Sequence, residues 1–411
     1  MSIKVVHINI SDGKGGAAIA AARLNQIMNQ SPKFSSKMLV MIKATSDNSV
    51  FELNWVYKLI ARINRCFDKI INFFNYSKFS FSLGLISCNI HKNYLIKDSD
   101  VIYIHWINSG MLSWKAIDKI IKLNKPVVFF THDMWFFSAG CHQAHNSLKY
   151  VCDDKNYYIY GLDCFKNNFL KNYLIKIFKK KRKSYLGSNV KIIAPSLGFQ
   201  NKLIYSNIIN EDKIFLIPNI LDISKFVPIK KEVKKQIKVL YGAMGGKSNI
   251  YKGWLDFIYF AEKINKIYGS KISFELFGYD FTETELQNIP FKVKSHGLIH
   301  DESKLISVYQ NADVFIFPSL LESFGQTLFE AMSCGLVPIS YNVGFANDII
   351  QNKINGFIVP PGDRNGLISC FHELMVMDII LLKSNSRSSV ENNFSTESSL
   401  KKHYNLIKKV L

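Results

Sequence analysis

The sequence predicts an α/β protein of two domains, each built on a parallel β-sheet with helices on both faces. The chain has 411 residues, more than a single hydrophobic core usually supports. Short apolar, β-rich runs alternate with helical patterns along both halves of the chain. The first of these runs leads through a glycine segment, Ser11 to Gly16, into a helical stretch. These three observations together indicate two domains of similar architecture.

The first half begins with the apolar run Ile3 to Ile10, and the Ala-rich stretch Ala17 to Asn29 after the glycine segment has helical composition. Further strands are expected at Lys37–Ile42, Val101–His105, Val127–Thr131 and Lys191–Ala194. Strands that alternate with helices form parallel sheets through right-handed crossovers. We therefore assign residues 1–230 to an N-terminal domain.

The second half repeats this alternation after Pro218. Its strands are expected at Lys238–Tyr241, Ser273–Phe277, Phe291–Ser295, Val314–Phe317, Val337–Ser340 and Gly356–Val359. The polar, Lys-rich segment Pro228 to Lys238 is the expected connection, so the second domain covers residues 231–395. Apolar residues at helical spacing over Ser398 to Leu411 predict a closing helix, residues 396–411, that crosses back to pack on the first domain.

Composition limits the classes of protein. Apolar residues make up 48% of the chain, which argues against disorder. The charge of +20 favours contact with phosphates, nucleic acid or an anionic leaflet, without choosing among them. Seven cysteines, an odd number, argue for reduced thiols. Because no uninterrupted apolar run is long enough for a spanning helix and Met1 to Ile10 does not resemble a signal peptide, we expect a cytoplasmic protein.

The segment from Asp313 to Pro338 carries the clearest chemical pattern. It reads as a strand, a loop and a helix, with Glu322 in the loop, Glu330 on the helix and seven residues between them. Phe324, Gly325, Gln326 and Thr327 fall where the helix begins, so their backbone N–H groups are free to bind an anion such as a diphosphate. The two carboxylates would accept hydrogen bonds from sugar and ribose hydroxyls.

This segment resembles the Glu-x7-Glu signature of the family 4 retaining glycosyltransferases, including the following Cys334-Gly335-Leu336-Val337-Pro338. The fold of that family is two facing Rossmann-like domains, called GT-B. The resemblance implies that Glu330 holds the donor ribose and that Glu322 lies near the transferred sugar. It also implies that the N–H groups at Phe324 to Thr327 bind that sugar.

Further positions of the second half fit the same family. Lys252, in the pair Lys252-Gly253, is expected to neutralise the donor diphosphate and stabilise the leaving nucleotide. Lys247 stands near the place where family members often carry an Arg, and a Lys cannot hold two phosphate oxygens as Arg does. Leu298 and Ile299, after Gly297, resemble the turn whose backbone reads the base.

The first half contributes two expected donor contacts. Gly15 and Gly16 resemble the family's glycine loop, which closely approaches the donor diphosphate and sugar. His132, in Thr131-His132-Asp133 at the end of an apolar strand, matches the family's active-site histidine. We expect it to contact the donor sugar and do not assign it as a general base.

The resemblance implies a hexose-type transfer from a nucleoside diphosphate sugar to a glycan or lipid-linked acceptor in envelope polysaccharide synthesis, such as O-antigen, capsule or colanic acid. In the implied front-face route, the leaving phosphate oxygen takes the acceptor proton. We expect no cofactor and no metal. Asp98-Ser99-Asp100 fits the metal-binding motif of another architecture, but it precedes a strand and is interpreted as a chance match.

Three other functions compete with transfer. A dinucleotide oxidoreductase would explain the glycine segment, but the strand Lys37–Ile42 ends in Lys43 instead of an acidic residue. A nucleic-acid-binding protein would explain the run Lys179 to Lys183, which we interpret instead as a solvated helix face. An epimerase or another non-transferase with the same fold is the third.

Two further segments stay open at this stage. The stretch Trp55 to Phe74 has an amphipathic, basic pattern that fits either an anionic membrane surface or packing on the first sheet. Cys141, His142, His145, Cys152 and Cys164 have part of the spacing of a zinc site. We interpret this cluster as a metal-free insertion loop near the acceptor.

Overall fold

The computed structural model describes the chain except Met1 and residues 76–79, 144–157 and 230–235. Contacts between residues divide it into two compact units. Unit 1 contains Met1–Pro195, Phe199–Asn219 and Leu400–Leu411, and unit 2 contains Ser196–Gly198 and Ile220–Ser399. The sequence placed the junction near residue 230. The chain thus leaves unit 1 and later returns to it.

Unit 1 is a seven-stranded parallel sheet in the order β3-β2-β1-β4-β5-β6-β7. Its strands are β1 (Ile3–Ser11), β2 (Phe34–Ile42), β3 (Val50–Glu52), β4 (Val101–Ile104), β5 (Val127–Phe130), β6 (Val190–Ala194) and β7 (Ile214–Leu216). Its helices are α1 (Gly16–Asn29), α2 (Trp55–Phe73), α3 (Tyr94–Asp98), α4 (Trp114–Ile121), α5 (Asn168–Leu186), α6 (Leu197–Ser206) and most of α14 (Thr396–Val410). The short edge strands β3 and β7 had not been expected from the sequence.

Unit 2 is a six-stranded parallel sheet in the order β10-β9-β8-β11-β12-β13. Its strands are β8 (Ile237–Gly242), β9 (Ile272–Phe277), β10 (Val293–Ser295), β11 (Val314–Phe317), β12 (Val337–Tyr341) and β13 (Phe357–Val359). Its helices are α7 (Trp254–Tyr268), α8 (Glu283–Gln287), α9 (Glu302–Gln310), α10 (Gln326–Ser333), α11 (Ala346–Ile349), α12 (Arg364–Leu374) and α13 (Ile379–Phe394).

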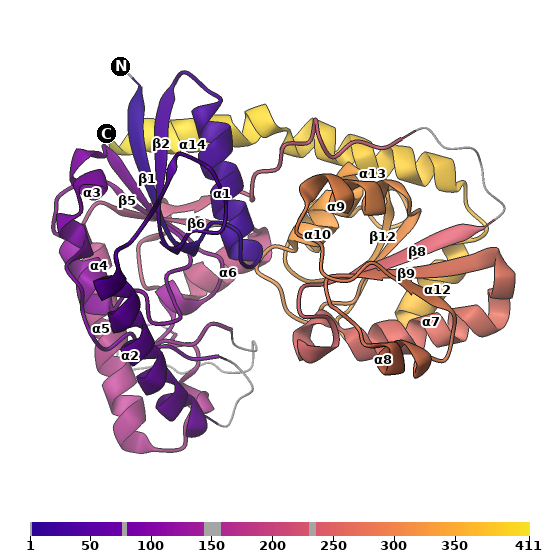
Figure 1. Ribbon diagram of the computed structural model, residues 1–411, viewed down its shortest axis with the longest axis horizontal. Helices are drawn as coiled ribbons and strands as arrows, with labels where there is room; N and C mark the ends of the chain where they lie inside the picture. The colour runs from indigo at the N-terminus through magenta and orange to yellow at the C-terminus, as the bar shows by residue number, and fades with distance from the viewer. Residues whose placement is uncertain (1, 76–79, 144–157, 230–235) are drawn as a thin grey trace. The chain divides into compact units, whose positions relative to one another are not determined.

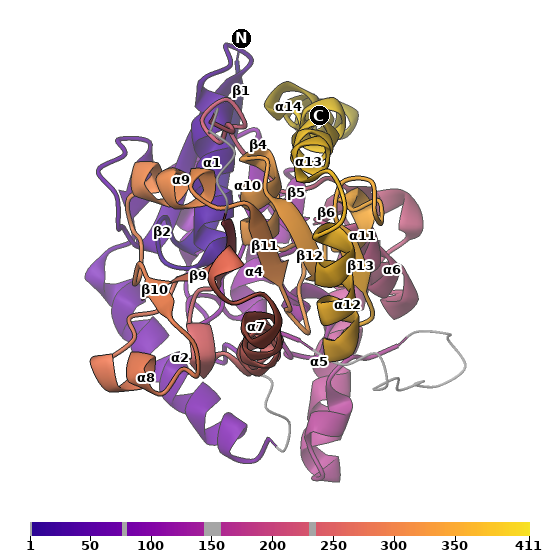
Figure 2. The same cartoon turned by 90° about the vertical axis from the view of Figure 1, so that its right-hand side faces the viewer.

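The core of unit 2 has two layers, one on each face of the sheet. Figure 1 shows α7 and α12 on one side and α9, α10 and α13 on the other. Figure 2 shows the neighbouring strands β11, β12 and β13 of this sheet side by side. The central strands β11 and β12 are covered on both faces, so their sequences are almost continuously apolar, as β11 (Val-Phe-Ile-Phe) illustrates.

No single helix among the described residues is long and apolar enough to cross a bilayer. Only as a pair, bent by 115° between them, do residues 364–374 and 379–410 have the length and apolarity of a membrane span. Their side chains Leu367, Phe371 and Val390 are fully buried against the sheet of unit 2 and its helices. The apolarity of this pair is therefore accounted for by the protein core.

Candidate active site

The carboxyl ends of β8 and β11 form the switch point of the unit 2 sheet, which we call the β8–β11 crevice. From β8 the chain continues to β9 and β10 on one side, whereas β11 is followed by β12 and β13 on the other side. The loops that follow β8 and β11 therefore run in opposite directions. Such a switch point is where open α/β sheets bind their ligands.

Lys252 lies in the loop that follows β8, and Gly253 places it. Gly253 has a φ of 68°, and a Cβ atom built there would overlap the carbonyl oxygen of Pro318. Tyr241 donates its hydroxyl hydrogen bond to the Lys252 carbonyl at 3.1 Å. The loop can come this close to the end of β11 because a glycine occupies the contact.

Lys252 and Glu322 meet across this crevice. The Nζ atom of Lys252 lies 2.5 Å from Oε1 of Glu322, which belongs to the loop after β11. The Glu322 side chain is 11% exposed and that of Lys252 is 25% exposed. The two opposite charges neutralise each other in this ion pair.

Glu330 lies in the protein interior on α10, the helix that follows the loop of Glu322. Its side chain is 3% exposed, and its Oε2 atom accepts a hydrogen bond from the Tyr309 hydroxyl at 2.8 Å. Burial of a carboxylate is costly unless hydrogen bonds hold it. The position is therefore built to present a fixed carboxylate.

The first turn of α10 follows a position, Gly325, that only a glycine fits. Gly325 has a φ of 105°, and an added Cβ would lie 2.9 Å from Cζ of Phe317. Phe324 is buried and stacks on Phe345 at 4.5 Å, so its side chain anchors the turn within the core. Gln326 and Thr327 are half-buried in the first turn, where N–H groups lack intrahelical partners.

Lys247 and the turn at Gly297 make other contacts. Lys247 forms an ion pair with Glu285 of α8, and this hydrogen bond raises the pKa of Lys247. The backbone N–H of Leu298 donates to Oδ1 of Asp280 at 2.7 Å, and Ile299 packs partly against the core of unit 2. The structure thus brings Lys252, Glu322 and the start of α10 to one crevice, whereas Lys247 is directed toward Glu285.

Unit 1 has its own switch point, between β1 and β4. Gly15, with a φ of 102°, is the residue before α1, and a Cβ added at Gly15 or Gly16 would meet no atom within 4 Å. The carboxylate of Asp12 fixes the loop by accepting from the N–H groups of Ala44 and Thr45 at 2.6 and 3.0 Å. The glycines therefore face open space on a loop that is held in place.

His132 ends a row of three histidines, one on strand β1 and the other two just after strands β4 and β5. Nδ1 of His7 lies 2.8 Å from Nε2 of His105, and Nδ1 of His105 lies 3.0 Å from Nε2 of His132. Burial lowers the pKa of His7 to about 3 and that of His132 to about 4, and it also lowers the pKa of His105. All three imidazoles are therefore neutral near pH 7.

The His7 end of this row fixes the direction in which its hydrogen bonds are donated. Among the described residues, Nε2 of His7 is buried and has no hydrogen-bond partner. A buried N–H without a partner is costlier than an unpaired acceptor nitrogen, so we infer that His7 carries its proton on Nδ1. His7 then donates to His105, and His105 donates from Nδ1 to His132. His132 consequently holds its own proton on Nδ1.

The sequence did not single out Asp133, which organises the surroundings of His132. Its Oδ2 atom accepts from Nε1 of Trp106 at 2.6 Å and lies 2.6 Å from Nδ1 of His142. Its Oδ1 atom accepts from the N–H of Trp135 at 2.9 Å. The adjacency of Asp133 to a strand-end histidine was the available signal, and its partners come from distant segments.

The interpretation of Lys179 to Lys183 as a solvated face is wrong at one position. Lys181 is only 1% exposed, and its Nζ donates to the carbonyls of Trp135 at 2.7 Å and Ser138 at 3.2 Å. Burial lowers its pKa to about 7. The helical period turns Lys181 inward while Lys179, Lys180 and Lys183 stay exposed.

The structure describes only some of the cysteines and histidines that have part of the spacing of a zinc site. His145 and Cys152 lie outside the described residues, and the described residues contain no cluster of three or more potential metal ligands. Cys141 and Cys164 are buried free thiols, and a hydrogen bond with Cys164 raises the pKa of Cys141. Asp98 of the Asp-Ser-Asp triplet pairs with Lys4 at 2.9 Å, at the amino end of β4 and away from His132.

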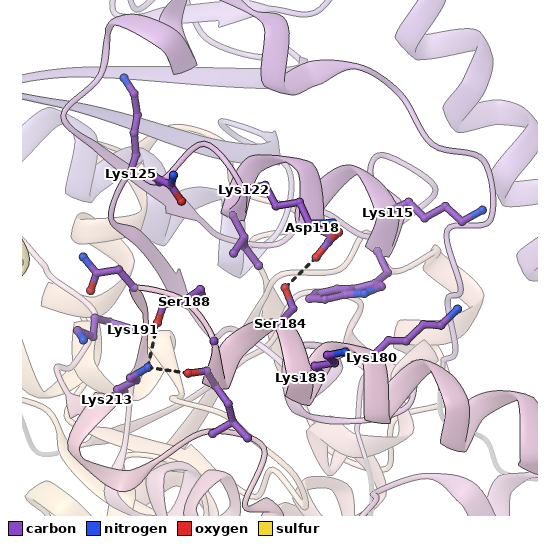
Figure 3. A pocket seen from close by; sticks show the side chains of 16 residues that line it. Lys115, Asp118, Lys122, Lys125, Lys180, Lys183, Ser184, Ser188, Lys191 and Lys213 are labelled. Atoms are coloured by element: carbon purple, nitrogen blue, oxygen red, sulfur yellow. Dashed lines mark hydrogen bonds and ion pairs between the residues drawn. The ribbon is translucent and has the colours of Figure 1, made fainter.

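A cleft of about 1120 Å³ lies at the opposite edge of the unit 1 sheet, between α4, α5 and the amino ends of β5, β6 and β7 (Figure 3). It is lined by Lys115, Lys122, Lys125, Lys180, Lys183, Lys191 and Lys213. Asp118 is the acidic lining residue, and it already pairs with Lys122 at 2.6 Å. Burial, followed by the charge of Lys213, lowers the pKa of Lys191. The cleft attracts anions but contains none of the expected site residues.

Two parallel-sheet units, each with a switch point in its strand order, are typical of the GT-B fold. A structure of the Anabaena protein Alr3699/HepE in complex with UDP and glucose superposes with a TM-score of 0.66 at 13% identity, over 99% of both chains. At this identity the likeness concerns the fold.

Residues 246–380, which include Lys252, Glu322 and Glu330, match the family described as glycosyl transferases group 1. The chain is 26% identical over 225 residues to the capsular polysaccharide biosynthesis glycosyltransferase CapM of Staphylococcus aureus, covering 50% of this chain and 58% of that protein. It is 24% identical over 196 residues to the UDP-Gal:alpha-D-GlcNAc-diphosphoundecaprenol alpha-1,3-galactosyltransferase of Escherichia coli, covering 44% and 51%. The chain thus spans little more than half the length of these relatives.

Proposed function

We propose that this protein is a retaining glycosyltransferase that moves a hexose-type sugar from a nucleoside diphosphate sugar to a glycan or lipid-linked acceptor in bacterial surface polysaccharide synthesis, such as capsule or O-antigen. The meeting of Lys252 and Glu322 at the β8–β11 crevice, together with the buried carboxylate of Glu330 on the next helix, carries this proposal. The group 1 family domain includes all three residues. The activities for which these two relatives are named fit the same reaction.

Each residue of the crevice has a chemical role in this proposal. The ammonium of Lys252 exchanges Glu322 for the donor diphosphate and then stabilises the leaving nucleotide. Glu322, released from the ion pair, accepts hydrogen bonds from the transferred sugar. Glu330, held by the hydrogen bond from Tyr309, accepts from the ribose hydroxyls. The first N–H groups of α10, at Gln326 and Thr327, donate to the sugar.

In unit 1, His132 and the Gly15–Gly16 loop are assigned to the same donor. With its proton on Nδ1, His132 can donate a hydrogen bond from that nitrogen. The same nitrogen cannot accept a proton from the acceptor hydroxyl. Transfer then follows a front-face route, in which the leaving phosphate oxygen takes the proton of the acceptor hydroxyl while the new glycosidic bond forms. No cofactor beyond the sugar nucleotide and no metal enters this scheme. Lys247, Leu298 and Ile299 are assigned to the nucleotide side of the donor.

We also place the reaction at the cytoplasmic face of the inner membrane, as a peripheral protein. The Escherichia coli relative acts on a diphosphoundecaprenol-linked acceptor, which resides in a membrane. The charge of +20 attracts an anionic leaflet. Nucleic acid is not among the partners of this proposal.

The test is release of free nucleoside diphosphate from a panel of nucleotide sugars, in the presence of EDTA. We expect release from one donor, and its loss in Lys252→Ala and in Glu330→Ala. Lys266→Ala, on the exposed side of α7 and paired with Glu262, is the matched control and should keep full activity. Folded protein that neither binds nor cleaves any donor would reject transfer, and activity that EDTA abolishes would reject the metal-free scheme.

A further inference from the structure

Helix α2 attaches to unit 1 through polar side chains. Asn64 donates from Nδ2 to the carbonyls of Ile86 and Gly110, both at 3.1 Å, and its Oδ1 accepts from the N–H of Ile86 at 2.8 Å. Asp68 accepts from the N–H of Leu83 at 2.8 Å. Both side chains are buried. The side of α2 that faces the protein is therefore its polar side.

The same side of α2 approaches the neighbouring backbone closely. Ala61 is the third buried residue of the helix, and a Cβ added at Gly110 would overlap its carbonyl oxygen. Asn72 adds two hydrogen bonds to the backbone of Phe81, at 2.7 and 3.0 Å. Hydrogen bonds and a glycine contact, in place of large apolar side chains, hold the helix in one orientation.

The outward side of α2 carries a continuous apolar row. We call it the α2 stripe: Trp55, Leu59, Ile63, Phe67, Ile70 and Phe73, which are between 40% and 82% exposed. Their spacing of three or four residues places them on one side of the helix. Both views show α2 at the periphery of unit 1 (Figure 1, Figure 2). This arrangement is the reverse of an ordinary surface helix, and soluble monomers seldom expose a patch of this size.

A second row, of basic residues, runs beside the stripe. Arg62, Arg65 and Lys69 are exposed, and Lys58 pairs with Glu52 at 2.9 Å. The one acidic residue of the helix, Asp68, is buried and faces the protein. The exposed side of α2 is therefore apolar along one line and positive along the next.

We propose that the α2 stripe is a membrane-docking surface that inserts into the interface of an anionic bilayer, with Arg62, Arg65 and Lys69 on the lipid phosphates. The proposal builds on the lipid-linked acceptor proposed above. An apolar face flanked by cations fits a bilayer, since acyl chains cover the one and headgroups neutralise the other. A second copy of the chain fits less well, because a symmetric contact would bring two basic rows together.

The test measures binding of the full chain to vesicles and needs no sugar donor. Wild-type protein should co-float with vesicles that contain phosphatidylglycerol and not with pure phosphatidylcholine vesicles. Leu59→Gln/Ile63→Gln/Ile70→Gln should lower the partition coefficient by at least about tenfold, because apolar side chains drive interfacial insertion. Ile267→Gln/Ile380→Gln/Val376→Gln is the matched control: it removes three apolar side chains of unit 2 that are more exposed than those of the stripe variant, and it should bind as wild type does.

A second variant tests the basic row. Arg62→Gln/Arg65→Gln/Lys69→Gln should lose the preference for phosphatidylglycerol, as should wild type at high salt. The fluorescence of Trp55 should shift to the blue on anionic vesicles, and Trp55→Phe should abolish the shift. Circular dichroism verifies that each variant is folded. Undiminished vesicle binding by the folded stripe variant would overturn the proposal, as would loss of a dimer without any change in lipid binding. Because donor cleavage is measured separately, each proposal can fail alone.

Discussion

The Nδ1 atom of His105 lies 3.0 Å from the Nε2 atom of His132, and a third histidine, His7, stands behind this pair. The unpaired nitrogen of His7 at the far end sets the proton positions along the row. A buried residue without access to substrate therefore determines which atom of His132 carries the proton.

We expect 15N-detected NMR of wild-type protein to show His132 as the Nδ1–H tautomer near pH 7. In His105→Leu the donor to Nε2 is lost, so the Nε2–H tautomer of His132 should become populated and donor cleavage should fall. His91→Leu, at a half-buried histidine of unit 1 that is not part of the row, is the control and should leave the tautomer unchanged. Finding Nε2–H in the wild type would contradict the inferred direction of the row.

Lys252→Ala should lower kcat/KM for the donor by about 10²- to 10³-fold, the usual cost of losing one group that stabilises developing charge. Lys247→Ala should cost much less, because the ammonium of Lys247 already pairs with Glu285. Steady-state kinetics of the two variants on the same donor makes the comparison. Equal losses would show that Lys247 turns from Glu285 to the diphosphate when the donor binds.

Glycine substitutions should separate folding from binding. Gly253→Ala forces a side chain onto Pro318 at a positive φ, so the free energy of unfolding should fall by about 1–3 kcal/mol. Gly16→Ala meets no atom within 4 Å, so its stability should stay within about 0.5 kcal/mol of wild type. If the donor approaches this loop, Gly16→Ala should nevertheless raise KM. Chemical denaturation and donor titration measure the two effects, and an unchanged KM would remove Gly16 from the site.

Lys181 should make stability depend on pH. Its pKa is about 7 when folded and near 10.5 when unfolded, so between these values the unfolded chain binds more protons. The free energy of unfolding should therefore rise with pH from about 7 to about 10.5 through this residue. In Lys181→Met that part of the slope should vanish, and Lys180→Met, on the exposed face, should retain it. Urea denaturation at several pH values decides between them.

Local patterns made much of this molecule predictable. The glycine loops and the Glu322–Glu330 segment could be read directly because each depends on neighbours along the chain, such as a strand followed by a turn and a helix. The alternation of strands and helices likewise predicted both parallel sheets. The edge strands β3 and β7 have three residues each, too few for a periodic signal.

The remaining features depend on contacts between distant segments. His7 and His105 precede His132 by many residues, and only the order of β1, β4 and β5 in the sheet brings them together. The pattern of α2 showed an amphipathic helix but not which side faces the protein, because Asn64 and Asp68 find their partners in loops further along. Lys181 was hidden in a basic run for the same reason.

The return of the chain to unit 1 affects how the protein is made. Residues 400–411 belong to unit 1, where His403 lies 3.2 Å from the hydroxyl of Tyr103 and Tyr404 packs edge-on against Phe34. During translation these residues leave the ribosome only after the whole of Ile220–Ser399. Unit 2 can therefore complete its fold first, while unit 1 waits with an uncovered patch around Phe34 and Tyr103. Although it comes first in the sequence, unit 1 is the part whose core is completed last, when synthesis reaches α14.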